Sequence, residues 1–473
     1  MDSSSSSTSQ HAFSVALSVL VKYLDQNDRD TRLWISIRSR ILNDLNTVLS
    51  EGQYKGYSAL FILARYPQGL QLLIDDAELR SKITAEGLNA IIPEGPHKGF
   101  AALTLLATGP DMVGLLNSDA DLRGKITAEA LNAVVGKFKR ISALFLLAAT
   151  SEGRQLLKSN ADLRSKITAE GLNTVVTTGP RRGRSALLYL TGNTHELRQM
   201  LIDDRALQDK ITAEGLNTAI PEGEEKGRSP LYYFSYEAKG RQLLKSNADL
   251  RGKIRAEGLN AVVAQGEERG MSALFFLAAT PEGRQLLKSN AYLRGKIRAE
   301  GLNAVVAQGK KRGASALFLL AHTPEGRQLL QSDADLRCKI RAEGLNAVVV
   351  EGPDKNKSVL SLLASNPEGR QLLKDDADLM GKVTSVGLNA VITKGLFKGY
   401  SALSLLANSP DGWRLLRDQK SFKDNIKLEC LVSMFLHYNN DGSVKQYSVL
   451  AHILEDKNKL ALSLMQVVKQ LSD

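Results

Sequence analysis

Residues 272–314 read SALFFLAATPEGRQLLKSNAYLRGKIRAEGLNAVVAQGKKRGA, and this stretch recurs with small changes along most of the chain. Its phrase GLNAVV places an asparagine at intervals of 43 residues, apart from one interval of 41 and one of 44. A fixed spacing of this length is typical of a tandem-repeat protein. The asparagines are Asn46, Asn89, Asn132, Asn173, Asn217, Asn260, Asn303, Asn346 and Asn389.

Two further phrases keep the same register. SALFLLA and its variants first occur at Ser58 and last at Ser448, while LRxKI recurs from residues 37–41 to residues 336–340. Because three separate phrases stay in step over this distance, we interpret the chain as one series of similar units.

The order of residues within 272–314 predicts short helices. Ser272 can cap the helix of SALFFLA, and Thr280 followed by Pro281 has the sequence of an N-cap with proline at the first helical position. Asn290 is expected to start a further turn of helix, and residues 299–306 a last one with Leu302, Val305 and Val306 inward.

A glycine-bounded loop, residues 308–313, leads to the next unit, and no stretch alternates polar and apolar residues over the length of a strand. A unit of about 43 residues buries too little surface to fold alone, so neighbouring units must share one core. The fold class predicted is all-α: a right-handed superhelical α-solenoid of about ten ~43-residue helical repeats with terminal caps.

The predicted organisation has four parts. We expect a disordered Ser-rich tail over 1–10, an N-terminal cap with the first partial repeat over 11–45, tandem helical repeats over 46–426, and a C-terminal capping repeat over 427–473. In the last part Val432 takes the place of the repeated asparagine, as expected of a cap that ends a stack.

Composition excludes several classes of protein. Of 473 residues, 43% are hydrophobic and 24% charged, which is typical of a globular protein. The two cysteines, Cys338 and Cys430, cannot form a disulfide scaffold or a four-cysteine zinc site, and the six histidines form no close ligand pair. We therefore expect no metal and no cofactor. No apolar run reaches about 18 residues and the N-terminus has no basic signal region, so we expect a cytoplasmic protein with no membrane span.

The repeat resembles two known families. Gly270-Met271-Ser272-Ala273-Leu274 is similar to the GxTPLHxAA start of an ankyrin repeat, and 227–231, GRSPL, is closer still. The EGRQLL that follows resembles the second ankyrin helix. Ankyrin units have about 33 residues, however, and a unit of about 43 with a third helix is similar to armadillo and HEAT repeats.

The resemblance implies a binding scaffold. Ankyrin-type arrays are also frequent among effectors that intracellular bacteria inject into host cells. The chain would then be a secreted bacterial effector acting in the host cytosol or nucleus, although fold alone does not fix function.

Three repeated columns each have a functional and a structural interpretation. The asparagines resemble the armadillo ladder that holds a bound peptide, but they lie beside apolar residues and we favour hydrogen bonds to neighbouring units. The aromatic residues of SALF could stack on nucleobases or pack between units, and we favour packing. The Arg and Lys of LRxKI are expected to form a solvated face, neutralised by the acidic residues Asp121, Asp162, Asp249 and Asp335.

Charge separates two classes of partner. The chain carries a net charge of +11, but successive units 142–184, 185–228, 229–271, 272–314 and 315–357 carry +4, −3, +2, +6 and 0. Nucleic acids require a continuous positive track, so this mosaic favours a protein partner and a non-enzymatic, monomeric interaction scaffold. A nucleic-acid-binding (modular DNA or RNA) or anionic-lipid-binding repeat protein is the alternative. No catalytic motif is found: the chain has no GxSxG and no Walker loop.

The units differ most in the loop before SAL. Drift of a solvent-exposed loop explains this variation, and so does a recognition rim built from stacked loop tips. On the second interpretation, the predicted partner-binding residues are Arg181, Arg182, Arg184, Glu224, Glu225, Lys226, Arg269, Lys310, Lys311 and Arg312.

Overall fold

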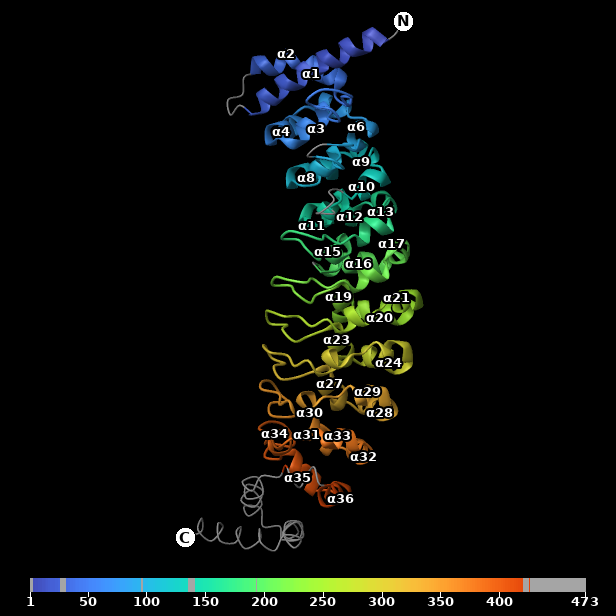
Figure 1. Ribbon diagram of the computed structural model, residues 1–473, viewed down its shortest axis with the longest axis vertical. Helices are drawn as coiled ribbons and strands as arrows, with labels where there is room; N and C mark the ends of the chain where they lie inside the picture. Colours follow the sequence, from blue (N-terminus) through green and yellow to red (C-terminus); the bar gives the residue numbers. More distant parts are fainter. Residues whose placement is uncertain are drawn as a thin grey trace, which may run out of the picture. The chain divides into compact units, whose positions relative to one another are not determined.

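The computed structural model describes residues 3–25, 31–94, 97–134, 141–192, 194–419 and 425. The described residues form helices joined by turns and loops and contain no strand, and an isolated antiparallel bridge joins Val348 and Ser358 (Figure 1). This confirms the all-α prediction. The helices form two compact units, Met1–Pro221 and Glu222–Asp473.

The first unit begins with two long helices, α1 (Ser3–Asp25) and α2 (Thr31–Asp44), which pack on each other. Tyr23 of α1 stacks on Trp34 of α2, with ring centroids 5.7 Å apart. Helix α1 starts inside the segment 1–10 for which we predicted a disordered tail, so the structure differs from that prediction from Ser3 onward. Adding a turn to an existing helix fixes few further dihedrals for each hydrogen bond gained, even where side chains are polar.

The rest of the first unit consists of short helices in sets of four, each set being one repeat. They are α3 (Ala59–Arg65), α4 (Pro67–Asp75), α5 (Ala77–Ser81), α6 (Ala85–Asn89), α7 (Ala102–Leu106), α8 (Pro110–Ser118), α9 (Ala120–Gly124), α10 (Ala128–Asn132), α11 (Ala143–Ala149), α12 (Ser151–Ser159), α13 (Ala161–Ser165), α14 (Ala169–Asn173), α15 (Ala186–Gly192), α16 (His195–Asp203), α17 (Arg205–Lys210) and α18 (Ala213–Asn217).

The second unit continues the same order of helices. They are α19 (Pro230–Tyr236), α20 (Ala238–Ser246), α21 (Ala248–Gly252), α22 (Ala256–Asn260), α23 (Ala273–Ala279), α24 (Pro281–Ser289), α25 (Ala291–Gly295), α26 (Ala299–Asn303), α27 (Ala316–His322), α28 (Pro324–Ser332), α29 (Ala334–Cys338), α30 (Ala342–Asn346), α31 (Val359–Ala364), α32 (Pro367–Asp375), α33 (Ala377–Gly381), α34 (Ser385–Asn389), α35 (Ala402–Ala407) and α36 (Pro410–Asp418). The predicted capping repeat, 427–473, lies outside the described residues.

The N-caps predicted for residues 272–314 are confirmed. The Ser272 side chain accepts a hydrogen bond from the backbone of Phe275 at 3.1 Å, and Asn290 caps α25 by accepting one from Leu293 at 2.9 Å. Thr280 caps α24, whose first residue is Pro281. These short polar side chains replace hydrogen bonds that the first turn of a helix cannot make internally.

The last helix of this repeat is shorter than predicted. Helix α26 ends at Asn303, whereas the apolar pattern indicated a helix to Val306. Ala304 leaves the helical region, and the backbone N–H of Val306 instead donates to the carbonyl of Ala314 at 2.8 Å. Val306 is buried all the same, because an extended residue can face the core as well as a helical one.

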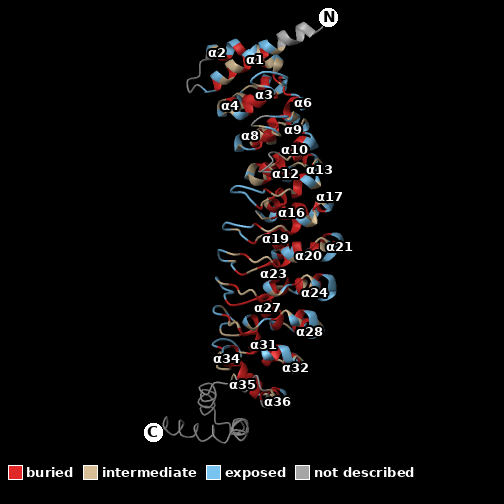
Figure 2. Cartoon of the chain, in the orientation of Figure 1, coloured by how far each residue is buried: buried red, intermediate tan, exposed pale blue. Residues whose placement is uncertain are grey.

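The core runs through the first helix of each set. Every residue of α3 except Arg65 is buried, and in each unit the first helices of successive sets pack on one another, as α19 does on α23 and α23 on α27. The second helices are amphipathic and bury a leucine pair such as Leu286 and Leu287 (Figure 2). Since each fully buried leucine stabilises by roughly 1.5–3 kcal/mol, contacts between repeats supply what a single repeat lacks.

Candidate partner-binding surface

In the parts of the connections that the structure describes, a short hairpin joins one repeat to the next. In residues 306–314 the backbone of Gly313 donates to Val306 at 2.8 Å, and the turn is closed by Arg312 donating to Gly309 at 2.9 Å. Gly309 and Gly313 have φ of 75° and 92°, a region that favours glycine. We call the equivalent stretches the hairpin loops: 49–57 and 176–184 in the first unit, and 263–271, 306–314, 349–357 and 392–400 in the second. Residues 222–228 of the second unit, where Lys226 donates to Gly223 at 3.1 Å, are counted with them.

Within the second unit, consecutive loops are joined through their backbones. Ala264 donates to Lys226 at 3.0 Å, Ala307 to Arg269 at 2.8 Å, and Val350 to Arg312 at 2.8 Å. The loops lie along one side of this unit, and their tips are exposed (Figures 1 and 2). A row of hydrogen-bonded loops therefore presents its tips from a fixed backbone.

Loop side chains also contact the aromatic residue of the preceding repeat. The Lys311 ammonium lies 5.4 Å from the ring centre of Phe275, and the Arg181 guanidinium lies 5.9 Å from that of Phe145. Where the aromatic residue is Tyr232, the partner is Glu268, which accepts its hydroxyl at 2.8 Å. A cation–π contact made by an exposed cation stabilises by about 0.5–1 kcal/mol, and Lys311 and Arg181 are exposed, so these side chains hold the loops in place.

The aromatic column itself is buried, with Phe61, Phe145, Tyr232, Phe275 and Phe318 at most 2% exposed. The column packs between repeats, which is the interpretation that we favoured from the sequence. Because the rings are buried, no nucleobase can reach them. Burial raises the pKa of the Tyr232 phenol, and the neighbouring Glu268 carboxylate raises it further.

The predicted partner-binding residues fall into two groups. Arg181, Arg182 and Arg184 belong to the first unit, and the others to the second. Arg182, Glu224, Lys226, Arg269 and Lys310 are exposed. The remaining residues have these neighbours: Arg184 lies against Tyr189, with 5.7 Å to the ring centre, Glu225 is 3.5 Å from Arg228, Arg312 is 3.8 Å from Glu351, and Arg181 and Lys311 lie over phenylalanines.

The loop of residues 349–357 has a different anchor. Asp354 lies 2.7 Å from the Lys357 ammonium and 3.5 Å from Nε2 of His322, at the end of α27. The hydrogen bond from His322, together with Lys357, lowers the pKa of Asp354 to about 2. Asn356 takes the place of the second glycine with φ of 66°, which asparagine tolerates better than most residues.

The asparagine column links repeats, as the favoured interpretation had it. Asn303 donates to the carbonyls of Ala299 at 2.7 Å and Lys339 at 2.8 Å, and it accepts from the backbone of Arg341 at 2.9 Å. Asn132, Asn173, Asn260 and Asn346 make the equivalent contacts. With its amide used in this way, the column has a structural role.

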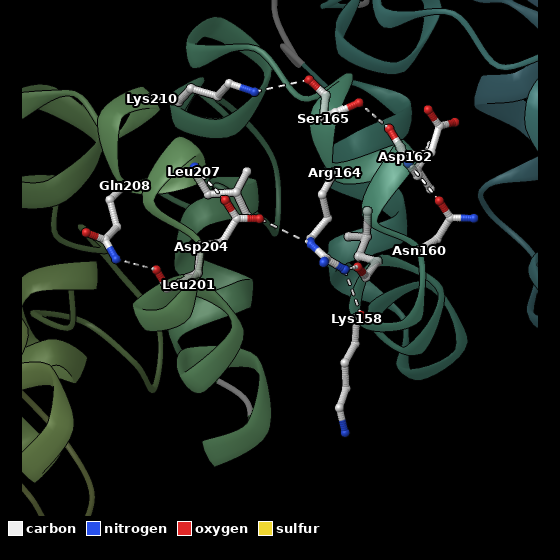
Figure 3. Close-up of polar contacts among 12 residues, drawn as sticks. Lys158, Asn160, Asp162, Arg164, Ser165, Leu201, Asp204, Leu207, Gln208 and Lys210 are labelled. Carbon is white, nitrogen blue, oxygen red and sulfur yellow. Dashed lines mark hydrogen bonds and ion pairs between the residues drawn. The ribbon is translucent and has the colours of Figure 1, made fainter.

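The arginine of LRxKI also links repeats, but not to the acidic residues that we predicted. Arg164 donates to the carbonyls of Leu157 at 2.9 Å and Lys158 at 2.7 Å, at the end of α12, and lies 3.3 Å from Asp204 (Figure 3). Asp204 is the N-cap of α17 in the next repeat, not the nearby Asp162, which pairs with Lys166. Arg294 and Arg337 pair likewise with Asp333 and Asp376. The prediction was right for the lysine, since Lys166 pairs with Asp162. It was wrong for the arginine, because it considered only acidic residues close by in the sequence.

A surface hollow of about 480 Å³ lies beside this link in the first unit. Its charges are largely paired, with Lys158 3.3 Å from Glu196 and Arg164 3.3 Å from Asp204. The residues that line it are Lys158, Arg164, Glu196, Gln199, Met200, Asp203, Asp204 and Arg205.

Over the part of the chain that the structure describes, no three His, Cys, Asp or Glu side chains are grouped as metal ligands, and no helix is long and apolar enough to cross a bilayer. Cys338 is exposed and free, and Cys430 lies outside the described residues. Comparison with protein-family models and with curated proteins finds no match to the chain.

Proposed function

We propose that the chain is a non-enzymatic protein–protein interaction scaffold that binds its partner through the hairpin loops. The observation that supports this most directly is the backbone ladder between loops, such as Val350 donating to Arg312 at 2.8 Å. Because the ladder fixes the backbone, the tips can differ in sequence at little conformational cost, and a preorganised surface binds with a smaller entropy loss.

The charges of the tips favour a protein over a polyphosphate. Residues 224–226 read Glu-Glu-Lys, 267–269 read Glu-Glu-Arg, and 310–312 read Lys-Lys-Arg. Two tips that each carry two glutamates and one basic residue thus precede a wholly basic tip on adjacent, hydrogen-bonded loops, whereas phosphate binding needs basic residues throughout. Nucleic acid or anionic lipid remains the alternative occupant, which the experiment below distinguishes.

We further propose that the repeats form a right-handed superhelical solenoid of about ten units, similar to ankyrin or armadillo proteins and monomeric in solution. The four-helix order that recurs within each compact unit supports this. On the same resemblance, the chain would act in a cytoplasm, as a bacterial effector in the cytosol or nucleus of a host cell.

A co-precipitation experiment tests the function. The tagged full chain captures partners, which mass spectrometry identifies, and a variant combines Lys226→Ser, Arg269→Ser and Lys310→Ser. Within the described residues these side chains are exposed and make no ion pair or side-chain hydrogen bond, so the variant should keep its melting temperature and lose the partner.

The matched control removes three charges from helices of the same unit: Lys245→Thr, Lys288→Thr and Lys374→Thr, all exposed. It should keep the partner. If both variants retain the partner, the loops are not the binding surface. If the partner is a nucleic acid bound with nanomolar affinity at physiological salt, the alternative holds instead.

A further inference from the structure

One position of the repeat carries a different type of residue in three consecutive repeats. The N-cap residue of the last helix in each set is threonine at 84, 127, 168 and 212 in the first unit and again at 384, but it is arginine at 255, 298 and 341. All three arginines lie in the second unit, at the starts of α22, α26 and α30.

The change removes a hydrogen bond from each helix. Thr168 caps α14 by accepting from the backbone of Gly171 at 3.1 Å, and Thr84, Thr127, Thr212 and Thr384 do the same. Helices α22, α26 and α30 have no side-chain cap. Losing an N-cap destabilises a helix, so the arginines do not serve the stability of these helices.

Contacts between the arginines and their neighbours offset little of that loss. Arg298 lies 2.9 Å from Glu257 and Arg341 lies 2.8 Å from Glu300, each pair joining adjacent repeats. The arginine side chains are 53% and 47% exposed, and ion pairs this open to solvent contribute little stability. The side chains of Arg298 and Arg341 thus keep much of their surface available.

The arginines form a row. Helices α22 and α26 are in contact, as are α26 and α30, so their first residues follow one another along the unit. Glu300 is influenced by two members of the row: hydrogen bonding to its own backbone lowers the pKa of its carboxyl group, and Arg341 and Arg298 lower it further.

The middle repeat also carries an exposed aromatic residue six positions before Arg298. Tyr292 stands where the adjacent repeats have Asp249 and Asp335, and it is 54% exposed. The Lys296 ammonium lies 4.6 Å from its ring centre. Replacing an acid by tyrosine here leaves residues 272–314 with 8 basic and 2 acidic side chains, the most basic of the five units compared. We call Arg255, Arg298, Arg341, Lys296 and Tyr292 the arginine strip.

We propose that the arginine strip docks an acidic segment of a protein partner. This rests on the proposed function, because it takes the partner to be a protein, and it adds the chemistry of that partner. Arginine and tyrosine are the residues that most often dominate protein interfaces. Glu257 and Glu300 interrupt the strip, which disfavours a nucleic-acid backbone but leaves room for a peptide whose carboxylates alternate with other side chains.

The strip and the hairpin loops are separate surfaces on the same repeats. The strip lies at the N-terminal ends of α22, α26 and α30, while the loops follow their C-terminal ends at Asn260, Asn303 and Asn346. Each surface can be altered without touching the other.

The test uses the full chain and a fluorescein-labelled polyglutamate peptide, followed by fluorescence anisotropy. The variant restores threonine at all three positions: Arg255→Thr, Arg298→Thr and Arg341→Thr. We expect the peptide to bind about tenfold more weakly to the variant, and its binding to the parent to weaken as salt rises from about 50 to 200 mM. The melting temperature of the variant should stay the same or rise, because threonine regains the N-cap.

Two comparisons make the result decisive. The control Lys245→Thr, Lys288→Thr and Lys374→Thr removes equal charge from α20, α24 and α32, and it should weaken the peptide by no more than about twofold. Peptide binding that is absent from the parent, or that falls equally in the two variants, overturns the proposal. So does tighter binding of single-stranded DNA than of the peptide. The loop variant described above tests the proposed function separately, since it leaves the strip intact.

Discussion

Two links between repeats, one in each compact unit, differ by one methyl group. In the second unit, Gly301 of α26 packs against the side chain of Asn260, and a Cβ there would overlap its Oδ1. In the first unit the equivalent of Gly301 is Ala130, in the helix capped by Thr127, whose backbone N–H donates to Asn89. The hydrogen bond from Thr127 to Asn89 is 3.2 Å long, whereas that from Arg298 to Asn260 is 2.8 Å.

The difference shows why most repeats have glycine rather than alanine at this position. Inside a helix, alanine is favoured over glycine by roughly 1 kcal/mol, so local propensity argues against the AEG sequence. Glycine persists because the asparagine of the preceding repeat needs the space. Contact between repeats therefore decides this residue, and Asn89 with Ala130 shows the looser link that a methyl group allows.

The largest expected effect comes from removing a link altogether. Asn303→Ala leaves the carbonyls of Ala299 and Lys339 and the N–H of Arg341 without their partner. Since unpaired buried polar groups each cost about 1–3 kcal/mol, we expect a loss of about 3 kcal/mol in urea unfolding. Exposed Gln285→Ala is the control and should cost under about 0.5 kcal/mol. Equal unfolding midpoints for the two variants would contradict a linking role.

Exchanging the methyl group sharpens the comparison directly. Gly301→Ala should destabilise by about 2 kcal/mol, because the overlap with Asn260 outweighs the gain in helix propensity. Ala130→Gly in the first unit relieves no steric overlap as large as the one that Gly301→Ala creates. Glycine also lowers the helix propensity by about 1 kcal/mol, so we expect little or no gain in stability. Urea midpoints measure both. A stabilising Gly301→Ala would show that the asparagine can move aside.

Local features of the repeat could be predicted from sequence. Ser272, Thr280 and Asn290 cap helices because a cap involves only the next three residues, which the sequence displays. The predicted end of this repeat's last helix at Val306 was wrong, because the apolar Val305 and Val306 fit a buried extended segment as well as a buried helix.

Contacts between repeats could not be read in the same way. Arg164 pairs with Asp204, 40 residues further on, and Lys311 lies over Phe275, 36 residues earlier. The same spacing occurs in the first unit, where Arg181 lies over Phe145, 36 residues earlier. A recurring spacing of this kind is visible in the sequence, but it does not show that the two residues are in contact. Which residues meet depends on how one repeat stacks on the next, and only the structure supplies that. The partner-binding role of the loop residues stays a prediction.

A contact within one repeat, the ion pair that anchors the loop 349–357, is sensitive to pH. The pKa of Asp354 is lowered from 3.8 to about 2 by His322 and Lys357, so its carboxylate stabilises the folded state above about pH 4 and ceases to do so as pH falls through 2. Because 28% of the side chain is exposed, we expect Asp354→Asn to cost only about 1 kcal/mol at pH 5. The gap between parent and variant should close by about pH 2. A gap independent of pH would mean that the charge contributes nothing.

The smallest change in unfolding free energy is expected at a loop tip, where the residue contributes little to contacts between repeats. Lys310→Ser removes an exposed side chain for which no ion pair or hydrogen bond occurs within the described residues, and the loop backbone is held by Val306 and Gly313. The unfolding free energy should change by under about 0.5 kcal/mol. The neighbouring Lys311→Ser should cost slightly more, about 0.5–1 kcal/mol, since it loses the contact with Phe275. Thermal melts of the two variants, side by side, test whether adjacent lysines on one loop differ in this way. If they melt alike, the ring contact does not hold the loop, and both lysines are free to serve a partner.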